Sequence, residues 1–170
     1  QEAHDAGFVH RDIKPGNLFV CQQASRPEFL KVLDFGLVTS ISARPTPHAP
    51  LLGTPPFMPP EQGIGFGDVD ARSDIYSLGA TAYFLVTGTT PFASPNPQMQ
   101  LLANLTEPVE PPSQRVTSVP HDLEAVILRC LEKEKADRFQ SMTELDEALS
   151  RCKCAQDWTE REALAWWRNS

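Results

Sequence analysis

The chain has 170 residues, a formal net charge of −7 and a hydrophobic fraction of 41%, which suits one domain with its own hydrophobic core. The acidic balance offers no basic patch to a phosphate backbone, so nucleic acid is excluded as an expected partner. The most apolar run, residues 78–86, is too short to cross a membrane, and no membrane contact is expected from this segment. The 4 cysteines lack zinc-ligand spacing and favour a reduced, cytoplasmic location.

The first third of the chain predicts short elements around a polar loop. Residues 1–6 are typical of the end of a helix whose beginning is missing, which suggests a fragment, and Gly7 is placed to end that helix. Residues 8–9 favour a short strand that leads into the polar loop at residues 10–17. Two β-rich runs follow, separated by a Pro-containing connection, and this pattern predicts a hairpin that ends at Asp34.

A long irregular segment and a buried helix are predicted next. Residues 37–67 are rich in Pro, Gly, Ser and Thr without periodicity, and loops of this length are usually functional. From Asp74 to Gly88 apolar residues surround every side of a predicted helix, which places that helix inside the core.

The last third predicts amphipathic helices. Leu101, Leu102 and Leu105 share one face of a first helix, and residues 123–131 repeat apolar side chains at helical spacing. Capping-box patterns starting at Ser141 and Thr159 predict two closing helices, near residues 142–151 and 160–168.

The polar loop combines three side chains suited to phosphoryl transfer. The carboxylate of Asp12 can aim an incoming hydroxyl, the ammonium of Lys14 can neutralise phosphate charge, and the amide oxygen of Asn17 can bind Mg²⁺. Asp34 offers a harder metal ligand at the end of the hairpin. Each residue taken singly also fits a turn, but a turn explains neither their combination nor their order.

His10-Arg11-Asp12 with Asn17, followed by Asp34-Phe35-Gly36, resembles the catalytic loop and metal-binding motif of protein kinases. The chain is similar to bacterial members of the eukaryotic-type Ser/Thr kinase family. The resemblance implies a mainly α (α+β) fold, the kinase C-terminal lobe with a small β-hairpin carrying the catalytic loop, and no N-terminal lobe in this chain. It covers residues 1–152 as a partial kinase domain and leaves residues 153–170 as a helical tail or linker.

The same resemblance implies a role for each loop residue, with ATP and Mg²⁺ as cofactors. Asp12 would orient and deprotonate the acceptor hydroxyl, and Lys14 would steady the γ-phosphate. Asn17 and Asp34 would hold Mg²⁺ bridging the ATP phosphates. Lys14 together with Thr54 is the pattern of kinases that act on Ser and Thr in protein substrates.

Arg11 implies, by resemblance, a cationic pocket for a phosphorylated residue of the long loop. The candidates are Thr39, Ser40, Ser42 and Thr46. Phosphorylation there would order the loop through charge-assisted hydrogen bonds. A Ser/Thr-rich loop is equally what any solvated segment looks like, so both interpretations stay open.

The resemblance also implies structural roles for three further residues, Glu61, Arg138 and Asp74, which would hold the site in place. The stretch from Gly53 to Glu61 looks like the kinase segment that ends in A-P-E, with Pro59 in the Ala position. The family pattern pairs Glu61 with Arg138 as a buried ion pair, whereas the alternative makes both ordinary surface charges. Asp74 would accept hydrogen bonds from backbone amides of the catalytic loop.

A complete kinase domain also has a Gly-rich hairpin, a strand Lys and a helix Glu, and none of these is found in the chain. We therefore expect an N-terminal lobe in the full-length protein and little activity from this chain alone. Two alternatives remain: a pseudokinase-like scaffold or binding module, and a small-molecule phosphotransferase. Asp12, Asn17 and Asp34 together argue against the scaffold, while Lys14, Thr54 and the Glu61 segment favour a protein substrate.

Overall fold

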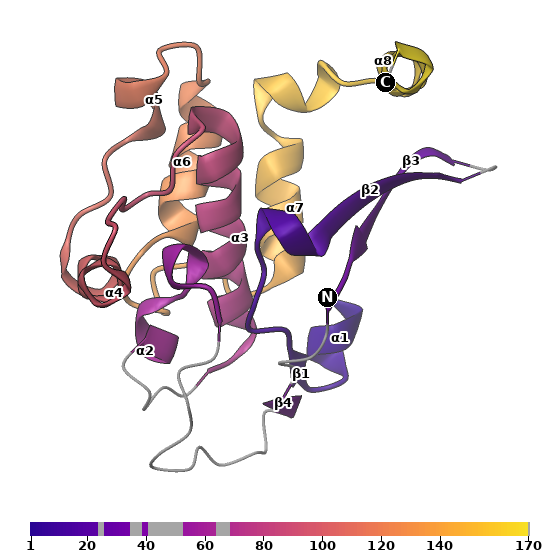
Figure 1. Cartoon of the computed structure of the whole chain (residues 1–170). Coiled ribbons are helices and arrows are strands. Elements are labelled where there is room, and N and C mark those ends of the chain that lie inside the picture. Colours follow the sequence, from indigo (N-terminus) through magenta and orange to yellow (C-terminus); the bar gives the residue numbers. More distant parts are fainter. Residues whose placement is uncertain (24–25, 35–38, 41–52, 64–68, 170) are drawn as a thin grey trace.

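The computed structural model describes residues 1–23, 26–34, 39–40, 53–63 and 69–169. A body of helices surrounds one central helix, and a β-hairpin projects from that body (Figure 1). The fold is mainly helical, as predicted. The helices, with short 3-10 turns labelled η, are α1 (Glu2–Asp5), η1 (Pro15–Asn17), η3 (Pro55–Phe57), α2 (Pro60–Gly63), α3 (Ala71–Thr87), α4 (Pro97–Thr106), α5 (Pro112–Arg115), α6 (His121–Cys130), α7 (Met142–Ser150), η4 (Lys153–Gln156) and α8 (Glu160–Asn169).

The strands form two small antiparallel sheets in the described part of the chain. β2 (Leu18–Gln23) pairs with β3 (Arg26–Val32), so that Leu18 lies opposite Val32. β1 (Phe8–Val9) pairs with β4 (Thr39–Ser40). The predicted hairpin is present, and Pro27 lies within β3 instead of in the connection. The polar loop lies between β1 and β2, so the hairpin holds this loop from one end instead of carrying it within its strands.

α3 is the centre of the core. The N-cap residue of α3, Asp70, forms a capping box with Ser73. Gly88 ends the helix with a φ of 75°. The helix therefore begins before Asp74, earlier than the apolar pattern indicated. Its buried residues face two hydrophobic clusters, one with Ile127 of α6 and one with Leu145 of α7. This confirms a helix buried in the core over most of its length, but not on every side, because Leu85 in its last turn is 67% exposed.

Gly79 lets α3 and α6 approach closely. A Cβ atom at this position would lie 2.4 Å from the Cβ of Cys130, which is far inside van der Waals contact. Cys130 itself is buried in the core, and burial raises the pKa of its thiol to about 12. The cysteine is thus a packing residue, as its helical spacing predicts.

α4 packs on a face other than the one that its leucines suggested. Leu102 and Leu105 are 50% and 37% exposed, whereas Gln100 and Asn104 are buried. The reason is hydrogen bonding: Asn104 Nδ2 donates to the carbonyls of Pro55 (2.8 Å) and Met58 (3.0 Å). A polar side chain inserted into a turn-rich segment satisfies carbonyls that a leucine would leave unpaired.

The segment predicted to be irregular contains short elements where it is described. These are β4, η3 and α2. Residues 41–52 and 64–68 lie outside the described residues, as do Phe35 and Gly36. In the described part of the chain, no helix has both the length and the apolarity needed to cross a membrane.

The two closing helices, α7 and α8, agree with the predicted ranges to within one residue. Ser141 accepts from the amide of Glu144 at 3.1 Å. The Glu144 carboxylate accepts from Gln140 N at 2.7 Å. In a standard capping box the donor would be the amide of the N-cap residue, here Ser141. The box at Thr159 is complete, because Thr159 N donates to Glu162 at 3.0 Å and Glu162 N donates back to the Thr159 hydroxyl.

Candidate active site

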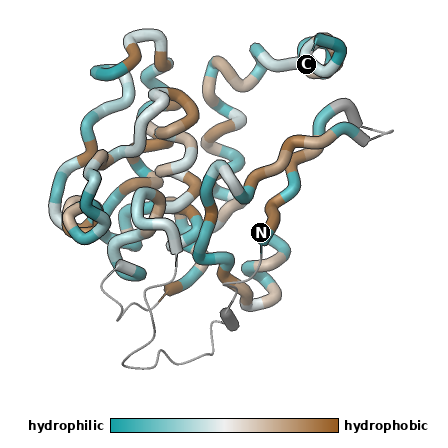
Figure 2. The backbone as a smooth tube through the Cα atoms, in the orientation of Figure 1, coloured by the Kyte–Doolittle hydropathy of each residue, from teal (hydrophilic) through white to brown (hydrophobic). Residues whose placement is uncertain are grey.

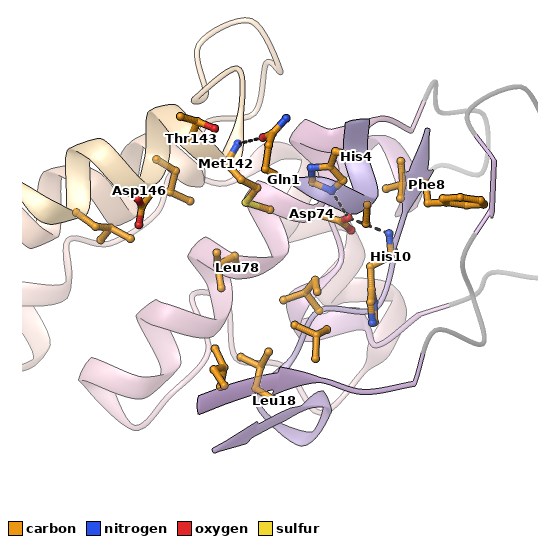
Figure 3. A pocket seen from close by; sticks show the side chains of 17 residues that line it. Gln1, His4, Phe8, His10, Leu18, Asp74, Leu78, Met142, Thr143 and Asp146 are labelled. Atoms are coloured by element: carbon orange, nitrogen blue, oxygen red, sulfur yellow. Dashed lines mark hydrogen bonds and ion pairs between the residues drawn. The ribbon is translucent and has the colours of Figure 1, made fainter. Parts of the chain in front are cut away.

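Asp74 of α3 holds the first turn of the polar loop. Its carboxylate accepts from the amides of His10 (2.8 Å) and Arg11 (2.9 Å) and contacts His4 Nε2 at 2.8 Å (Figure 3). Arg11 adopts a left-handed φ of 69°, a conformation that costs energy for a residue with a Cβ. Gln62 Nε2 donates to the Arg11 carbonyl at 2.9 Å, so both backbone groups of this strained residue are fixed.

Asp12 lies at the centre of a closed hydrogen-bonded group. Lys14 Nζ lies 2.6 Å from Asp12 Oδ2, and the Thr54 hydroxyl donates to Asp12 Oδ1 at 2.8 Å. Lys14 Nζ also donates to Thr54 Oγ1 at 2.7 Å. Asp12 is 9% exposed, which limits competition from water. Residues far apart in sequence are thus brought around one carboxylate, as a phosphoryl-transfer site requires.

Asn17 contacts the same Asp12 oxygen as Lys14. Its amide nitrogen donates to the Asp12 carbonyl at 2.8 Å and to Asp12 Oδ2 at 3.2 Å. The amide group is buried and its nitrogen faces Asp12, so its oxygen points the other way. An amide oxygen is a suitable ligand for Mg²⁺.

The hairpin brings Asp34 back to the loop. Leu33, the preceding residue, donates its amide to the Asn17 carbonyl at 2.8 Å, and its carbonyl lies 3.1 Å from His10 Nε2. Asp34 has a left-handed φ of 61°, which Asp tolerates better than most residues. Asp34 therefore directly follows a residue that is hydrogen-bonded to the loop that carries Asp12 and Asn17.

The side-chain oxygens of Asn17 and Asp34 are of the ligand type that Mg²⁺ prefers. The described residues contain no group of three or more His, Cys, Asp and Glu side chains that could hold a metal by themselves. Mg²⁺ commonly takes only one or two protein ligands and fills its octahedron with water and substrate phosphates. One carboxylate, from Asp34, and one amide oxygen, from Asn17, match that requirement when a nucleotide supplies the remaining oxygens.

Glu61 and Arg138 form the buried ion pair that the resemblance implied. Arg138 Nη1 and Nη2 each lie 2.9 Å from a Glu61 oxygen, and the Arg138 side chain is 0% exposed. The other guanidinium hydrogens are donated to the carbonyls of Glu132, Lys133 and Arg72. All five donors of the guanidinium are therefore used. The alternative of two surface charges is wrong.

Glu61 remains ionised despite its burial. Desolvation raises the pKa of its carboxyl, but hydrogen bonds from Arg138 and Ser73 and the charge of Arg138 outweigh that effect and hold the pKa below its usual value. The Ser73 hydroxyl donates to Glu61 Oε1 at 2.7 Å. Because Gln62 follows Glu61 and bonds to Arg11, the ion pair positions the polar loop as well as the segment after Thr54.

Arg11 has a buried side-chain nitrogen, Nε, without a hydrogen-bond partner among the described residues. Burial lowers the pKa of its guanidinium, partly opposed by the charge of Asp74. Of the four candidate phosphorylation sites, Thr39 and Ser40 form β4, in which Thr39 pairs with Val9 just before the loop. Ser42 and Thr46 lie outside the described residues.

Sequence reasoning missed two residues that support the site, Gln62 and Asn104. Gln62 follows Glu61 in a segment without periodicity, so no pattern marks it. Asn104 did leave a signal, because it lies four residues after Gln100 and both polar side chains share one face of α4.

Comparison with known proteins decides the family. The family model described as the protein kinase domain matches residues 1–149. The chain belongs to the protein kinase family. Similar kinases include the serine/threonine-protein kinase Pkn1 of Myxococcus xanthus, 44% identical over 151 residues, which are 88% of this chain and 22% of that protein. PknB of Mycobacterium leprae is 38% identical over 156 residues, or 91% of this chain and 24% of that protein.

A third similar kinase, pkn3 of Myxococcus xanthus, is 40% identical over 146 residues, 81% of this chain and 26% of that protein. The chain thus spans about a quarter of the length of these curated relatives. The kinase match ends within α7, so the residues from η4 to the end of α8 lie beyond it.

Proposed function

We propose that this chain is the catalytic part of a serine/threonine protein kinase, which transfers the γ-phosphate of ATP to Ser and Thr hydroxyls of protein substrates. The observation that carries the proposal is the hydrogen-bonded group of Asp12, Lys14 and Thr54, with Asn17 against the same carboxylate. The relatives' names, serine/threonine-protein kinases, support the same acceptor class.

In this proposal Asp12 orients the acceptor hydroxyl and takes its proton. A bond forms between the acceptor oxygen and the γ-phosphorus, while the bond from that phosphorus to the bridging oxygen breaks and ADP leaves. Because the transition state of phosphoryl transfer is loose, positioning matters more than the strength of the base. Asp12 is suited to this because contacts to both of its oxygens fix the carboxylate plane.

Lys14 neutralises charge on the transferring phosphate. Its ammonium group is held by both Asp12 and Thr54, so it is preorganised next to the place where charge moves. Asn17 and Asp34 would hold Mg²⁺. When bound, Mg²⁺ neutralises the charge on the ATP phosphates. A protein acceptor is favoured over a metabolite because Thr54 opens the segment that Glu61 and Asn104 fix to the helical body.

The remaining assignments belong to the same proposal. Residues 1–152 form a partial kinase domain, and residues 153–170 form a separate tail. The N-terminal, ATP-binding lobe of the kinase domain (the ATP-gripping lobe) is the expected intramolecular partner. Without it the chain transfers little phosphate. Arg11 receives a phosphorylated loop residue, supported by its buried Nε. The four cysteines are free thiols, in keeping with a cytoplasmic location.

The proposal is tested by phosphate transfer from γ-labelled ATP to casein. We expect the purified chain alone to stay near background. Fusion of Gln1 to the ATP-gripping lobe of Pkn1 should restore transfer by at least about a hundredfold, because proximity and orientation supply much of the catalysis. Phosphoamino-acid analysis should find label on Ser and Thr.

Two results would contradict this proposal. A folded fusion that transfers no label would support the scaffold alternative, and label that appears on small-molecule hydroxyls instead of casein would support the small-molecule phosphotransferase. Circular dichroism of the fusion provides the control for folding.

A further inference from the structure

The hairpin determines where the two proposed magnesium ligands lie. β2 begins directly after Asn17, and β3 ends two residues before Asp34. An isolated two-stranded hairpin is at best marginally stable in water. This hairpin projects from the helical body (Figure 1), and Figure 2 shows hydrophobic residues along both of its strands. The geometry of the site therefore depends on whatever holds the hairpin in place.

The helical body supports one face of the hairpin incompletely. Alternation along β3 places Glu28, Leu30 and Val32 on the same face. Leu30 and Val32, with Leu18 opposite, line a cavity of about 520 Å³ between the hairpin and helices α1, α3 and α7 (Figure 3). Leu30 is 52% exposed. Contacts with the core thus leave the outer part of this face without support.

The C-terminal tail contacts the hairpin on that face. Trp158 Nε1 donates to Glu28 Oε2 at 2.6 Å, across 130 residues of sequence. The following helix, α8, packs against β3. These residues lie beyond the kinase match. The tail is therefore a second support for the hairpin, and it is held to α6 of the helical body by the bond from Lys153 N to Asp122 Oδ2 at 2.8 Å.

Trp158 also lies at the start of α8. Thr159 is the N-cap of this helix, so Trp158 immediately precedes its first turn. Ala163, the fourth residue of the helix, is only 2% exposed. Trp158 thus links the start of α8 to β3. Phe19 on the opposite face of the hairpin is 60% exposed and Leu30 on the tail's own face is 52% exposed, so the contact at Glu28 leaves both side chains open to water.

We propose that residues 153–169 form a strap that braces the hairpin, and that Trp158 is a positioning residue for Asn17 and Asp34. The strap rests on contacts of the tail alone. Its effect on catalysis rests on the proposed function, and the two are tested by separate measurements.

Hydrogen exchange of the whole chain tests the strap itself. Trp158→Phe keeps the ring and removes the N–H donor. Because one charge-assisted bond is lost, we expect amides of β2 and β3 to exchange about three- to tenfold faster, while α3 amides exchange at an unchanged rate. Glu28→Ala should accelerate exchange as much as Trp158→Phe does, and Glu28→Gln should retain most of the protection. The double variant Trp158→Phe/Glu28→Ala should add nothing to either single change, since both remove one contact.

Trp167→Phe is the matched control, because it makes the same chemical change in α8 at a tryptophan whose ring contacts Trp166 rather than Glu28. Unchanged exchange in Trp158→Phe would overturn the strap. So would equal acceleration by Trp167→Phe, since the effect would then belong to tryptophan content and not to the contact with Glu28.

Catalysis provides the second measurement, in the fusion with the Pkn1 lobe. Trp158→Phe should raise the Mg²⁺ concentration for half-maximal rate about three- to tenfold, with a smaller change in the rate at saturating Mg²⁺, and Glu28→Gln should behave like the unchanged fusion. An unchanged Mg²⁺ requirement alongside faster exchange would overturn the positioning role of Trp158. A fusion without any transfer would count against the proposed function alone, while exchange still decides the strap.

Discussion

Arg138→Met is expected to lower the free energy of unfolding by about 3–5 kcal/mol, because it leaves the Glu61 carboxylate buried without its partner. The side chain of Arg138 is 0% exposed, and its guanidinium also binds three backbone carbonyls that methionine cannot satisfy. Urea unfolding followed by circular dichroism measures the loss. Glu61→Gln should also destabilise the chain, since it leaves the guanidinium without a counter-charge.

Arg151→Met is the matched control. Arg151 pairs with Glu147 on the surface of α7 at 3.1 Å, with side chains 75% and 60% exposed. Exposed pairs of this kind contribute about 0.3–0.5 kcal/mol. Equal destabilisation by the two substitutions would show that burial of the Glu61–Arg138 pair has no energetic consequence.

The difference in the free energy of unfolding between the wild type and Arg138→Met should depend on pH. The pKa of Glu61 is lower in the folded protein than its ordinary value of 4.5. Its stabilising contribution is therefore complete above pH 4.5 and is lost as the pH falls through the lower folded-state pKa. The two unfolding curves should be furthest apart near neutral pH and should converge in acid.

Asp12→Asn in the fusion kinase is expected to reduce the rate of phosphate transfer by about 10²–10⁴-fold, the range for removal of a catalytic proton acceptor. The substitution preserves shape and can still accept from Thr54. It removes the site for the acceptor proton and the negative charge that holds Lys14 at 2.6 Å. Initial rates at saturating ATP and casein measure the effect.

Asp137→Asn makes the same change at an exposed position in the turn before Arg138 and should leave the rate within about twofold. The thermal unfolding midpoint of Asp12→Asn should stay close to that of the unchanged fusion. A folded Asp12→Asn fusion that retains more than about a tenth of the rate would remove Asp12 from the role of proton acceptor.

The sequence predicts the central part of the fold well, because strong local patterns specify it. α3 is apolar on every side and ends at a left-handed Gly88, and both features are visible in the residues themselves. Capping residues mark the starts of α7 and α8 in the same way. The loop residues around Asp12 were found through a motif, in which residue types and spacing specify the chemistry directly.

Other features depend on contacts that no local pattern records. β1 and β4 are two residues long and become strands only by pairing with each other. The burial of Asn104 depends on carbonyls of the segment before α2, so leucine spacing indicated the wrong buried face for α4. The bond from Trp158 to Glu28 joins the tail to β3, a long-range contact that single-sequence reasoning does not reveal.

A crystal structure of the fusion kinase with Mg²⁺ and a non-hydrolysable ATP analogue would locate the metal and the nucleotide together. We expect Mg²⁺ to be bound by the Asn17 amide oxygen and the Asp34 carboxylate at about 2.1 Å, with Asp12 and Lys14 facing the γ-phosphate. A nucleotide-bound structure in which Asp34 and Asn17 contact different ligands, or in which Asp12 faces away from the γ-phosphate, would rule out this site.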